Sequence, residues 1–260
     1  MLKPWLKLFR VVNLPTVPGD VLVGAAAAMA CLRSADVSAR VGVPISLAVV
    51  SSVFMYMFGL ADNDIIGAAF DKGRPIPDGE ISMRDAKLAR GLCLALGFIP
   101  VLAAVLWLSE FSVPIAAPGI LVPLVLAKAI VSYNRLKSPL LMGACRGLNV
   151  LLGVTAAIPP FMLPRSVARA PYAACVVAAV VLLWTAYIAA VTWYSNGEER
   201  DPERRRKVGL LVGGIVYMQL VALIAFTVFD PTLKPLLVAG AVLLVLLRVV
   251  CRAFPKVSAS

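Results

Sequence analysis

The sequence predicts an all-α fold, a polytopic bundle of transmembrane helices. The first observation is composition: of 260 residues, 61% are hydrophobic and only 15% are charged, whereas soluble globular proteins carry roughly 25% charged residues. The second is a series of apolar stretches, each near the ~20 residues that a helix needs to cross a bilayer. The third is an uneven distribution of Lys and Arg between alternate loops. Together these observations exclude a soluble domain, a disordered chain and a small disulfide scaffold.

Eight apolar stretches are expected to cross the membrane. They are helices, because backbone groups in lipid must form their hydrogen bonds within their own segment. Gly and Pro inside the stretches do not exclude this, since neighbouring helices can satisfy the freed groups. The predicted spans, which form a single domain over 1–260, are 12–31, 43–62, 88–109, 112–132, 139–159, 171–193, 208–228 and 233–251.

The net charge of +11 indicates orientation in a membrane rather than binding to nucleic acid. With the N-terminus placed in the cytoplasm, the cytoplasmic segments hold 18 of the 25 Lys and Arg residues, and the opposite segments hold five. We therefore expect a multi-pass protein of a bacterial inner membrane, with its polar loops cytoplasmic. The absence of His excludes His-ligated zinc and Ser-His-Asp catalysis.

The first polar loop, 62–87, carries most of the residues that suggest chemistry. On a continuing helix, Asp64 and Asp71 lie within about 20° of each other, and Asn63 lies on the adjoining stripe. Carboxylate and amide oxygens suit Mg²⁺, which leaves positions open for phosphate oxygens. Arg74 offers a guanidinium fork for the phosphate itself. The alternative is that these are only polar residues at the end of a span.

The second loop, 133–138, combines a phenol, an amide and two cations at a helix–helix turn. Tyr133 and Lys137 suit an anionic headgroup or a diphosphate. The same residue types also anchor helices at the membrane interface, which is the alternative reading of this loop.

The third loop, 194–207, is rich in both acids and Arg. Glu198 and Asp201 share a helix face if the helix persists that far, but Pro202 disfavours helical geometry at Asp201. The alternative is a solvated run of charges that contacts anionic lipid.

Four of the polar residues inside the apolar spans are candidates for function or anchoring. Arg146 and Asn149 lie on one face of the fifth span, and a buried cation in lipid is a functional candidate by default. Lys128 in the fourth span can extend to the interface. Asn13, near the start of the first span, either adds an amide to the same site or satisfies a helix end.

Several stretches resemble the UbiA superfamily of intramembrane prenyltransferases. Asn63-Asp64-x-x-Gly67-x-x-x-Asp71 followed by Arg74-Pro75-Ile76-Pro77 is similar to the first acidic signature of that family. The runs from Arg10 to Asp20 and from Tyr133 to Lys137 are similar to its first helix and its tyrosine–lysine loop. The run from Leu141 to Asn149 resembles in particular the EboC-like branch.

The resemblance implies a helical bundle around a central cavity, in which Mg²⁺ bridges an allylic prenyl diphosphate to two acidic motifs. It implies transfer of the prenyl group to a lipophilic aromatic or hydroxyl acceptor. By matching position, the implied metal ligands are Asn63, Asp64, Asp71, Glu199 and Asp201. The implied diphosphate contacts are Arg74, Tyr133 and Lys137, with Asp64, Asp71 and Lys137 as the catalytic set. Asn13, Arg146 and Asn149 are further candidate substrate contacts.

The chain departs from the family pattern at three points. Gly67 stands where the family has its middle aspartate, the third loop lacks a clear D-x-x-x-D, and eight spans are found instead of nine. Seven residues of ideal helix cover about 10.5 Å, so Asp64 and Asp71 cannot share one Mg²⁺ unless the helix unwinds. These departures favour a second hypothesis, a non-catalytic protein that binds or helps to export an isoprenoid or another amphiphile. A secondary transporter is a third possibility. It would have charged residues near the middle of several spans, and only Lys128 and Arg146 come close to that depth.

Overall fold

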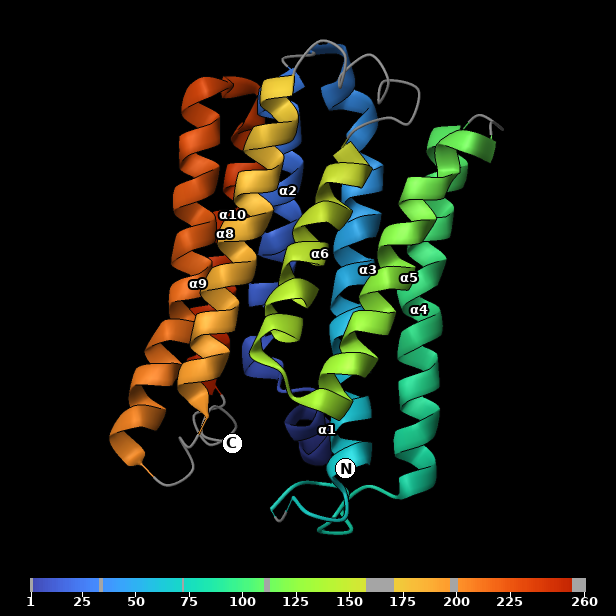
Figure 1. Cartoon of the computed structure of the whole chain (residues 1–260), viewed down its shortest axis with the longest axis vertical. Helices are drawn as coiled ribbons and strands as arrows, with labels where there is room; N and C mark the ends of the chain where they lie inside the picture. Colours follow the sequence, from blue (N-terminus) through green and yellow to red (C-terminus); the bar gives the residue numbers. More distant parts are fainter. Residues whose placement is uncertain are drawn as a thin grey trace.

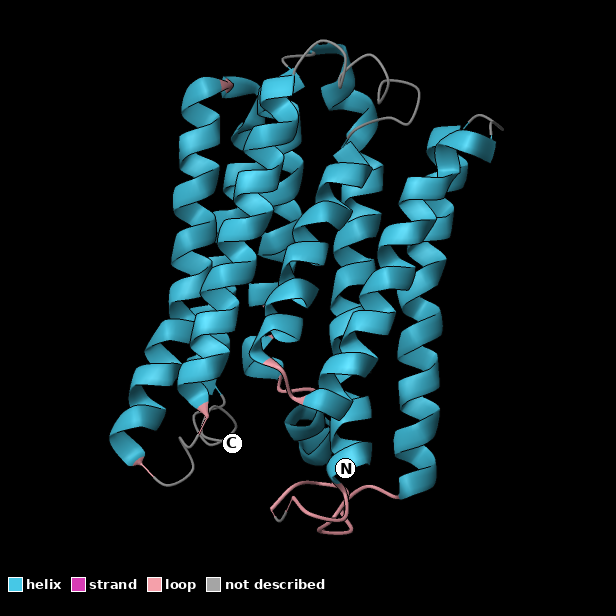
Figure 2. Ribbon diagram, viewed as in Figure 1, coloured by secondary structure: helices cyan, strands magenta, loops and turns pink. Residues whose placement is uncertain are grey.

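The computed structural model describes residues 2–32, 35–71, 73–109, 113–157, 171–196 and 201–253. All regular secondary structure in these ranges is helical (Figures 1 and 2). In chain order the elements are α1 (Leu2–Leu8), η1 (Val11–Asn13), α2 (Thr16–Leu32), α3 (Ala35–Gly67), α4 (Met83–Ser109), α5 (Val113–Leu136), α6 (Pro139–Ala157), α8 (Pro171–Ser195), α9 (Pro202–Phe229), η4 (Pro231–Leu233) and α10 (Lys234–Ala253).

The predicted membrane architecture is confirmed. Within the described ranges, eight helical segments are long and apolar enough to cross a membrane, and each overlaps one predicted span. The protein is therefore a multi-pass integral membrane protein. The predicted end of the second span, at 62, was wrong: α3 continues to Gly67. Asp62, Asn63 and Asp64 remain helical because each finds a polar partner at the edge of the bundle.

The bundle has α2 and α6 at its centre. Figure 1 shows α3, α4 and α5 on one side of this pair and α8, α9 and α10 on the other. The span that contains α2 is 78% buried, whereas the span that contains α10 is 11% buried. Lipid is as apolar as Leu, so close packing rather than the hydrophobic effect must hold the central pair together.

Reciprocal glycine contacts join α2 to α6. A Cβ atom placed on Gly24 would lie 1.9 Å from the carbonyl oxygen of Val150, and one on Gly153 would lie 2.0 Å from the carbonyl oxygen of Val21. Neither helix can accept a side chain at its glycine without moving apart. The missing side chains therefore set the distance between the two central helices.

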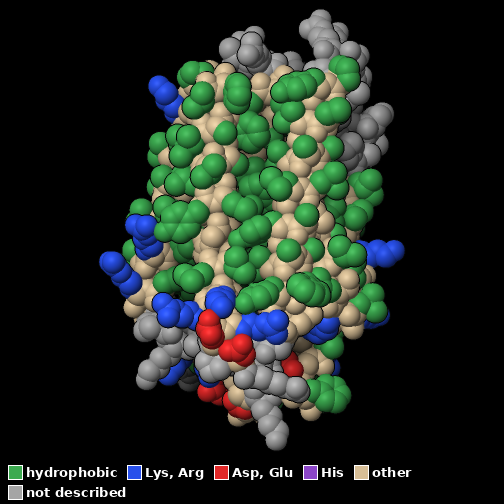
Figure 3. Space-filling model, turned by 60° about the vertical axis from the view of Figure 1, so that its left-hand side comes forward, with side chains coloured by type: hydrophobic (Ala, Val, Ile, Leu, Met, Phe, Trp, Pro, Cys, Tyr) green, Lys and Arg blue, Asp and Glu red, His purple; other side chains and the backbone are tan. Residues whose placement is uncertain are grey.

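The outer surface of the bundle is mainly apolar, as expected for helices that face lipid. Hydrophobic side chains cover the helices in Figure 3, and Lys, Arg, Asp and Glu gather mainly at one end. At that end lie α1, the loop from α3 to α4, the turn from α5 to α6, and the facing ends of α8 and α9 (Figure 1). The described residues of the three polar loops thus gather at one end of the bundle, as the prediction that they share one face of the membrane requires.

Gly153→Val tests the contact between α2 and α6. The new side chain meets the Val21 backbone, so we expect a loss of stability of at least the ~1–3 kcal/mol that overpacking usually costs. Thermal unfolding in detergent measures the loss. Gly91→Val is the matched control, because a Cβ at Gly91 has no neighbour within 4 Å. Equal melting temperatures for the two variants would contradict the close approach.

Candidate functional site

The last turns of α3 bring two polar residues to the loop end of the bundle. Asp64 lies one turn before the helix ends at Gly67, and it is only 3% exposed. Its neighbour Asn63 donates to the Asp64 carboxylate through its side-chain amide, at 3.4 Å. A carboxylate this deep needs a cation close by, because burial disfavours its charged form.

Arg74 supplies that cation and also contacts the second carboxylate. Its Nη1 lies 2.5 Å from Asp64 Oδ1, and its Nε lies 3.2 Å from Asp71 Oδ2. The chain turns after Gly67, whose carbonyl accepts from the backbone N–H of both Phe70 and Asp71 at 2.9 Å. The helical spacing expected for Asp64 and Asp71 was therefore wrong: α3 ends in time for both to reach one guanidinium.

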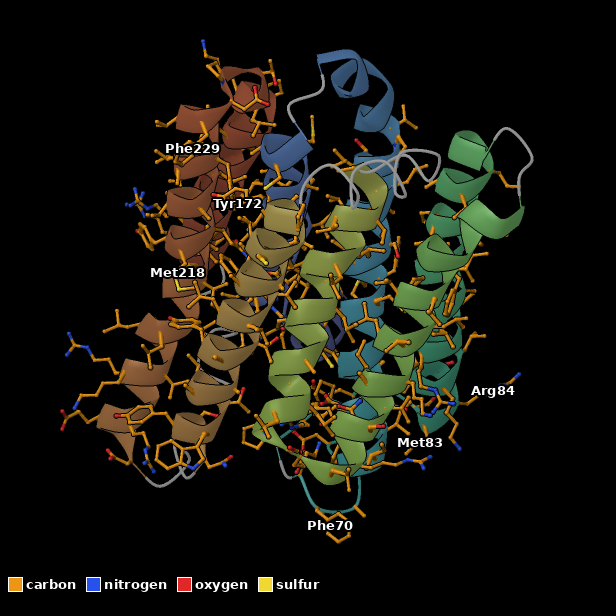
Figure 4. All side chains as sticks on the ribbon, turned by 45° about the horizontal axis from the view of Figure 1, so that its top comes forward. Phe70, Met83, Arg84, Tyr172, Met218 and Phe229 are labelled. Atoms are coloured by element: carbon orange, nitrogen blue, oxygen red, sulfur yellow. The ribbon has the colours of Figure 1, made fainter. Side chains whose placement is uncertain are left out.

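Gly67 makes room for the Asp71 carboxylate. A Cβ atom at this position would lie 2.5 Å from Asp71 Oδ2 and 3.0 Å from its Cγ. The missing side chain at Gly67 thus leaves space for the Asp71 carboxylate beside the end of α3. Figure 4 shows that the ring of Phe70, at the tip of this turn, points away from the bundle.

The rest of the loop is held rigidly against the N-terminal segment. Gly73 and Gly79 adopt φ of 80° and 73°, a conformation that favours glycine, and the Asp78 side chain accepts from the backbone N–H of Gly73 at 3.2 Å. Ile76 and Ile81 are buried in a small apolar cluster with Leu8 of α1. Arg74 therefore extends from a fixed loop.

Lys137 approaches the same residues from α5. It follows the helix end in a left-handed conformation, φ 52°, and its backbone N–H donates to the Tyr133 carbonyl at 2.7 Å. The ammonium donates to Asn63 Oδ1 and lies 5.8 Å from the centre of the Tyr133 ring. Burial lowers the pKa of Lys137; attraction by Asp71 opposes this shift, and repulsion by Arg74 and Arg10 adds to it. We call Asn63, Asp64, Asp71, Arg74 and Lys137 the loop-end cluster.

Arg10 is a neighbour of the loop-end cluster that the sequence analysis did not select. It is half-buried, it begins η1 in a left-handed conformation (φ 40°), and its charge acts on Lys137. Within the described ranges it forms no ion pair. The signal in the sequence was a cation three residues before Asn13, at the start of a long apolar span.

The chemistry of the loop-end cluster fits Mg²⁺. No three Asp, Glu or Cys side chains gather around one point in the described ranges. Two carboxylates and one amide oxygen nevertheless supply hard oxygen donors, and Mg²⁺ is usually bound by one or two carboxylates together with substrate phosphates. Arg74 and Lys137 stand beside these donors as cations for the phosphates.

The other predicted site residues are placed differently. Asn13 closes η1, where its backbone N–H donates to Arg10 and its carbonyl accepts from Thr16. Asp201 caps α9 by accepting from the N–H groups of Glu203 and Arg204, at 2.9 and 3.2 Å. The helix α8 ends at Ser195, and Asp201 has an extended backbone (φ −132°, ψ 105°). Glu198 and Glu199 lie outside the described residues.

Arg146 does not join the loop-end cluster. Its Nε lies 2.7 Å from Oδ2 of Asp20, a fully buried carboxylate of α2, and its Nη2 donates to the Thr16 carbonyl at 2.8 Å. Asn149, the other residue predicted on this face, is buried one turn further along and also faces Asp20. The guanidinium expected to contact substrate is therefore engaged by a carboxylate of the protein itself.

Asp20 is the centre of a network that joins the central helices α2 and α6 to α8 and α9. Its Oδ1 also accepts from Trp184 Nε1 of α8 at 2.9 Å and from Gln219 Nε2 of α9 at 2.7 Å. Gly19 admits the glutamine, because a Cβ there would lie 2.0 Å from Gln219 Oε1. The sequence analysis missed this role of Asp20, although an acid within the first apolar span was the available signal. We call Asp20, Arg146, Trp184 and Gln219 the Asp20 network.

The Asp20 network predicts a specific stability pattern. Arg146→Met leaves the Asp20 carboxylate buried without its counter-charge, and such a loss costs about 3–5 kcal/mol. Adding Asp20→Asn removes the stranded charge but keeps an oxygen for Trp184 and Gln219, so the double variant should be more stable than Arg146→Met alone. Thermal unfolding in detergent measures both. A double variant less stable than Arg146→Met would show that the ion pair is not the main interaction.

Comparison with known proteins identifies the fold. No protein-family model matches the sequence, and no curated protein sequence matches it. Among solved structures, a UbiA homolog from Archaeoglobus fulgidus bound to Cd²⁺ is similar with a TM-score of 0.50 and 14% identity, over 97% of this chain and 87% of that one. A digeranylgeranylglyceryl phosphate synthase structure is similar with a TM-score of 0.51 and 15% identity, over 99% of this chain and 97% of that one. Likeness at this identity concerns the fold, and the resemblance found in the sequence is confirmed at that level.

Proposed function

We propose that this chain, a membrane protein with the UbiA fold, transfers an isoprenyl group from an allylic prenyl diphosphate to a lipophilic acceptor with the help of Mg²⁺. The observation that carries the proposal is the loop-end cluster, which combines two carboxylates, an amide and two cations at the polar end of an apolar bundle. Such a site suits a ligand with a charged head and a greasy tail.

The similar structures support this assignment at the level of class. One is described as a digeranylgeranylglyceryl phosphate synthase in membranes, and the other is bound to Cd²⁺. Both cover nearly the whole of this chain. We extend to this protein the reaction class and the use of a divalent cation, and we place the loop end on the cytoplasmic side of a bacterial inner membrane on the basis of its Lys and Arg content.

Each member of the loop-end cluster then has a role. Asp64, Asp71 and Asn63 would hold Mg²⁺, which supplies charge neutralisation for the diphosphate leaving group. Arg74 and Lys137 contact the phosphate oxygens, with Tyr133 beside them. The allylic C–O bond breaks, diphosphate leaves with the bonding pair, and the acceptor forms the new bond to carbon as it loses a proton. The two cations stabilise the charge that develops on the departing oxygen.

Ligand binding at this site is an exchange of partners. The carboxylates of Asp64 and Asp71 already hold Arg74, and Asn63 holds Lys137. A bound Mg²⁺ would be held by the oxygens of Asp64, Asp71 and Asn63. Arg74 and Lys137 would then be available to donate to the diphosphate oxygens. The two carboxylates and two cations of the site sum to zero, so Mg²⁺ alone would leave an excess of positive charge and a diphosphate alone an excess of negative charge. The metal and the diphosphate should therefore each assist the binding of the other.

The remaining predicted residues enter the proposal differently. Glu199 and Asp201 are proposed as a second acidic motif, which requires Asp201 to leave its capping position on α9. Asn13 is proposed as an amide near the diphosphate. Arg146 is proposed to support the bundle through its ion pair with Asp20, and the buried Asn149 is proposed to help it, in place of the substrate contacts expected from the sequence.

A second function is favoured by one observation, the limited number of carboxylates. Asp64 and Asp71 are the acids that share Arg74, and Asp201 is occupied as a helix cap. A protein of this kind would bind an isoprenoid or another amphiphile, or help to export it, without turnover. Binding of a prenyl diphosphate without release of pyrophosphate would favour this second function.

Asp64→Ala tests the enzymatic proposal. Purified protein with Mg²⁺ and a set of allylic diphosphates and acceptors should release pyrophosphate, and the variant should lose this activity because it removes the buried metal ligand. Asp78→Asn is the matched control, since Asp78 belongs to the same loop and its hydrogen bonds to described residues stay within that loop. Full activity in Asp64→Ala would contradict the assignment of the loop-end cluster.

Arg74→Ala tests the exchange of partners. The variant frees Asp64 and Asp71, so Mg²⁺ alone should bind about fivefold more tightly, roughly the worth of a partly exposed ion pair. Binding of pyrophosphate in the presence of Mg²⁺ should weaken, because the phosphate loses its guanidinium. Isothermal titration calorimetry measures both affinities. A change of both in the same direction would argue against exchange.

A further inference from the structure

A buried amide lies directly behind the loop-end cluster. Asn134 of α5 is 2% exposed, and its Nδ2 donates to two acceptors on α3: the Gly59 carbonyl and Asp62 Oδ2, both at 2.9 Å. One turn earlier on α5, Ile130 packs against Gly59, where a Cβ would lie 2.9 Å from Ile130 Cγ2. Two contacts, one apolar and one polar, therefore fix how far α5 extends along α3.

Asp62, which accepts from Asn134 of α5, is also bonded to α4. It is 4% exposed, and its Oδ1 accepts from Arg90 Nη1 of α4 at 3.1 Å. Two residues along a helix correspond to about 200° of rotation, so Asp62 and Asp64 face opposite sides of α3. The same turn of α3 thus presents one carboxylate to its neighbouring helices and the other to Arg74.

The register of α5 decides where Lys137 lies. The helix ends at Leu136, two residues after Asn134, and the left-handed Lys137 directs its ammonium to Asn63 Oδ1. Asn63 follows Asp62 directly, so Asn134 and Lys137 of the same chain segment contact adjacent residues of α3. A shift of α5 by one residue, about 1.5 Å of rise with a 100° rotation, would take Lys137 away from the loop-end cluster.

We infer that Asn134 is a positioning residue, which through Gly59 and Asp62 sets the register of α5 and so holds the Lys137 ammonium at the loop-end cluster. The inference rests on the proposed function for its consequence, since a held Lys137 is what a diphosphate would contact. Asn134 acts through Lys137 and touches no ligand. Its effect on diphosphate affinity therefore depends on the presence of the lysine.

A double-mutant cycle on the full chain tests this dependence. Pyrophosphate affinity with Mg²⁺ is measured by calorimetry for Asn134→Ala, for Lys137→Ala and for the two together. Each single variant should weaken binding by about tenfold, the scale of one hydrogen bond to a charged group. The double variant should be no weaker than Lys137→Ala. Effects that multiply to about a hundredfold would overturn the inference, because Asn134 would then act independently of Lys137.

A second readout does not require any ligand to bind. Lys137 should react faster with an amine-acylating reagent in Asn134→Ala than in the wild-type protein, as followed by mass spectrometry of the labelled peptide. Ser51→Ala is the matched control: it removes another buried hydrogen bond of α3, to the Gly97 carbonyl at 2.6 Å, far along the helix from Lys137. Unchanged labelling in Asn134→Ala would overturn the inference.

The two readouts separate the two possible failures. If wild-type protein binds no pyrophosphate with Mg²⁺ but Lys137 labelling rises in Asn134→Ala, the proposed function fails and the positioning role stands. If wild-type protein binds pyrophosphate and Asn134→Ala changes neither affinity nor labelling, the positioning role fails and the proposed function stands. Where Asn134→Ala does not fold, Asn134→Ser is the smaller change, and it should shift both readouts in the same direction.

Discussion

A charge within a membrane protein must find a partner inside the protein, because lipid offers none. This constraint explains why Asp20 has its counter-charge 2.7 Å away on α6 and two further donors from α8 and α9. The carboxylate cannot turn to lipid, so four helices must meet around it. The Asp20 network and the glycine contacts between α2 and α6 thus serve the same end, one by polar specificity and the other by close packing.

The loop-end cluster obeys the same constraint with a different outcome. Arg74 is 29% exposed and the Asp71 side chain 37%, so this group of charges meets water at its edge. Partners at such a place can be exchanged for ligands, whereas those of Asp20 cannot. Burial therefore separates the two polar groups of the bundle into one that determines structure and one that is suited to bind a phosphorylated lipid. Sequence chemistry alone did not separate them, since both contain Arg and Asp.

The last turns of α3 both hold neighbouring helices in place and contribute to the loop-end cluster. Asp62 holds α4 and α5 in place, and Asp64 faces Arg74. Gly59 and Gly67 flank the segment, the first permitting close contact with Ile130 and the second making room for the Asp71 carboxylate. The position of Lys137 at the site then depends on a hydrogen bond made on the far side of the helix.

The sequence by itself determined the class of fold, the eight spans and the end of the bundle at which the polar loops gather, because these follow from composition, length and the distribution of Lys and Arg. It also selected Asn63, Asp64, Asp71, Arg74 and Lys137, which the structure brings together. Only the tertiary structure decided that Arg146 belongs to Asp20, that α3 ends before Asp71, and that Asn134 donates to Gly59 and Asp62. Each of these depends on which residue of another helix lies opposite, and sequence spacing carries that information only within a single helix.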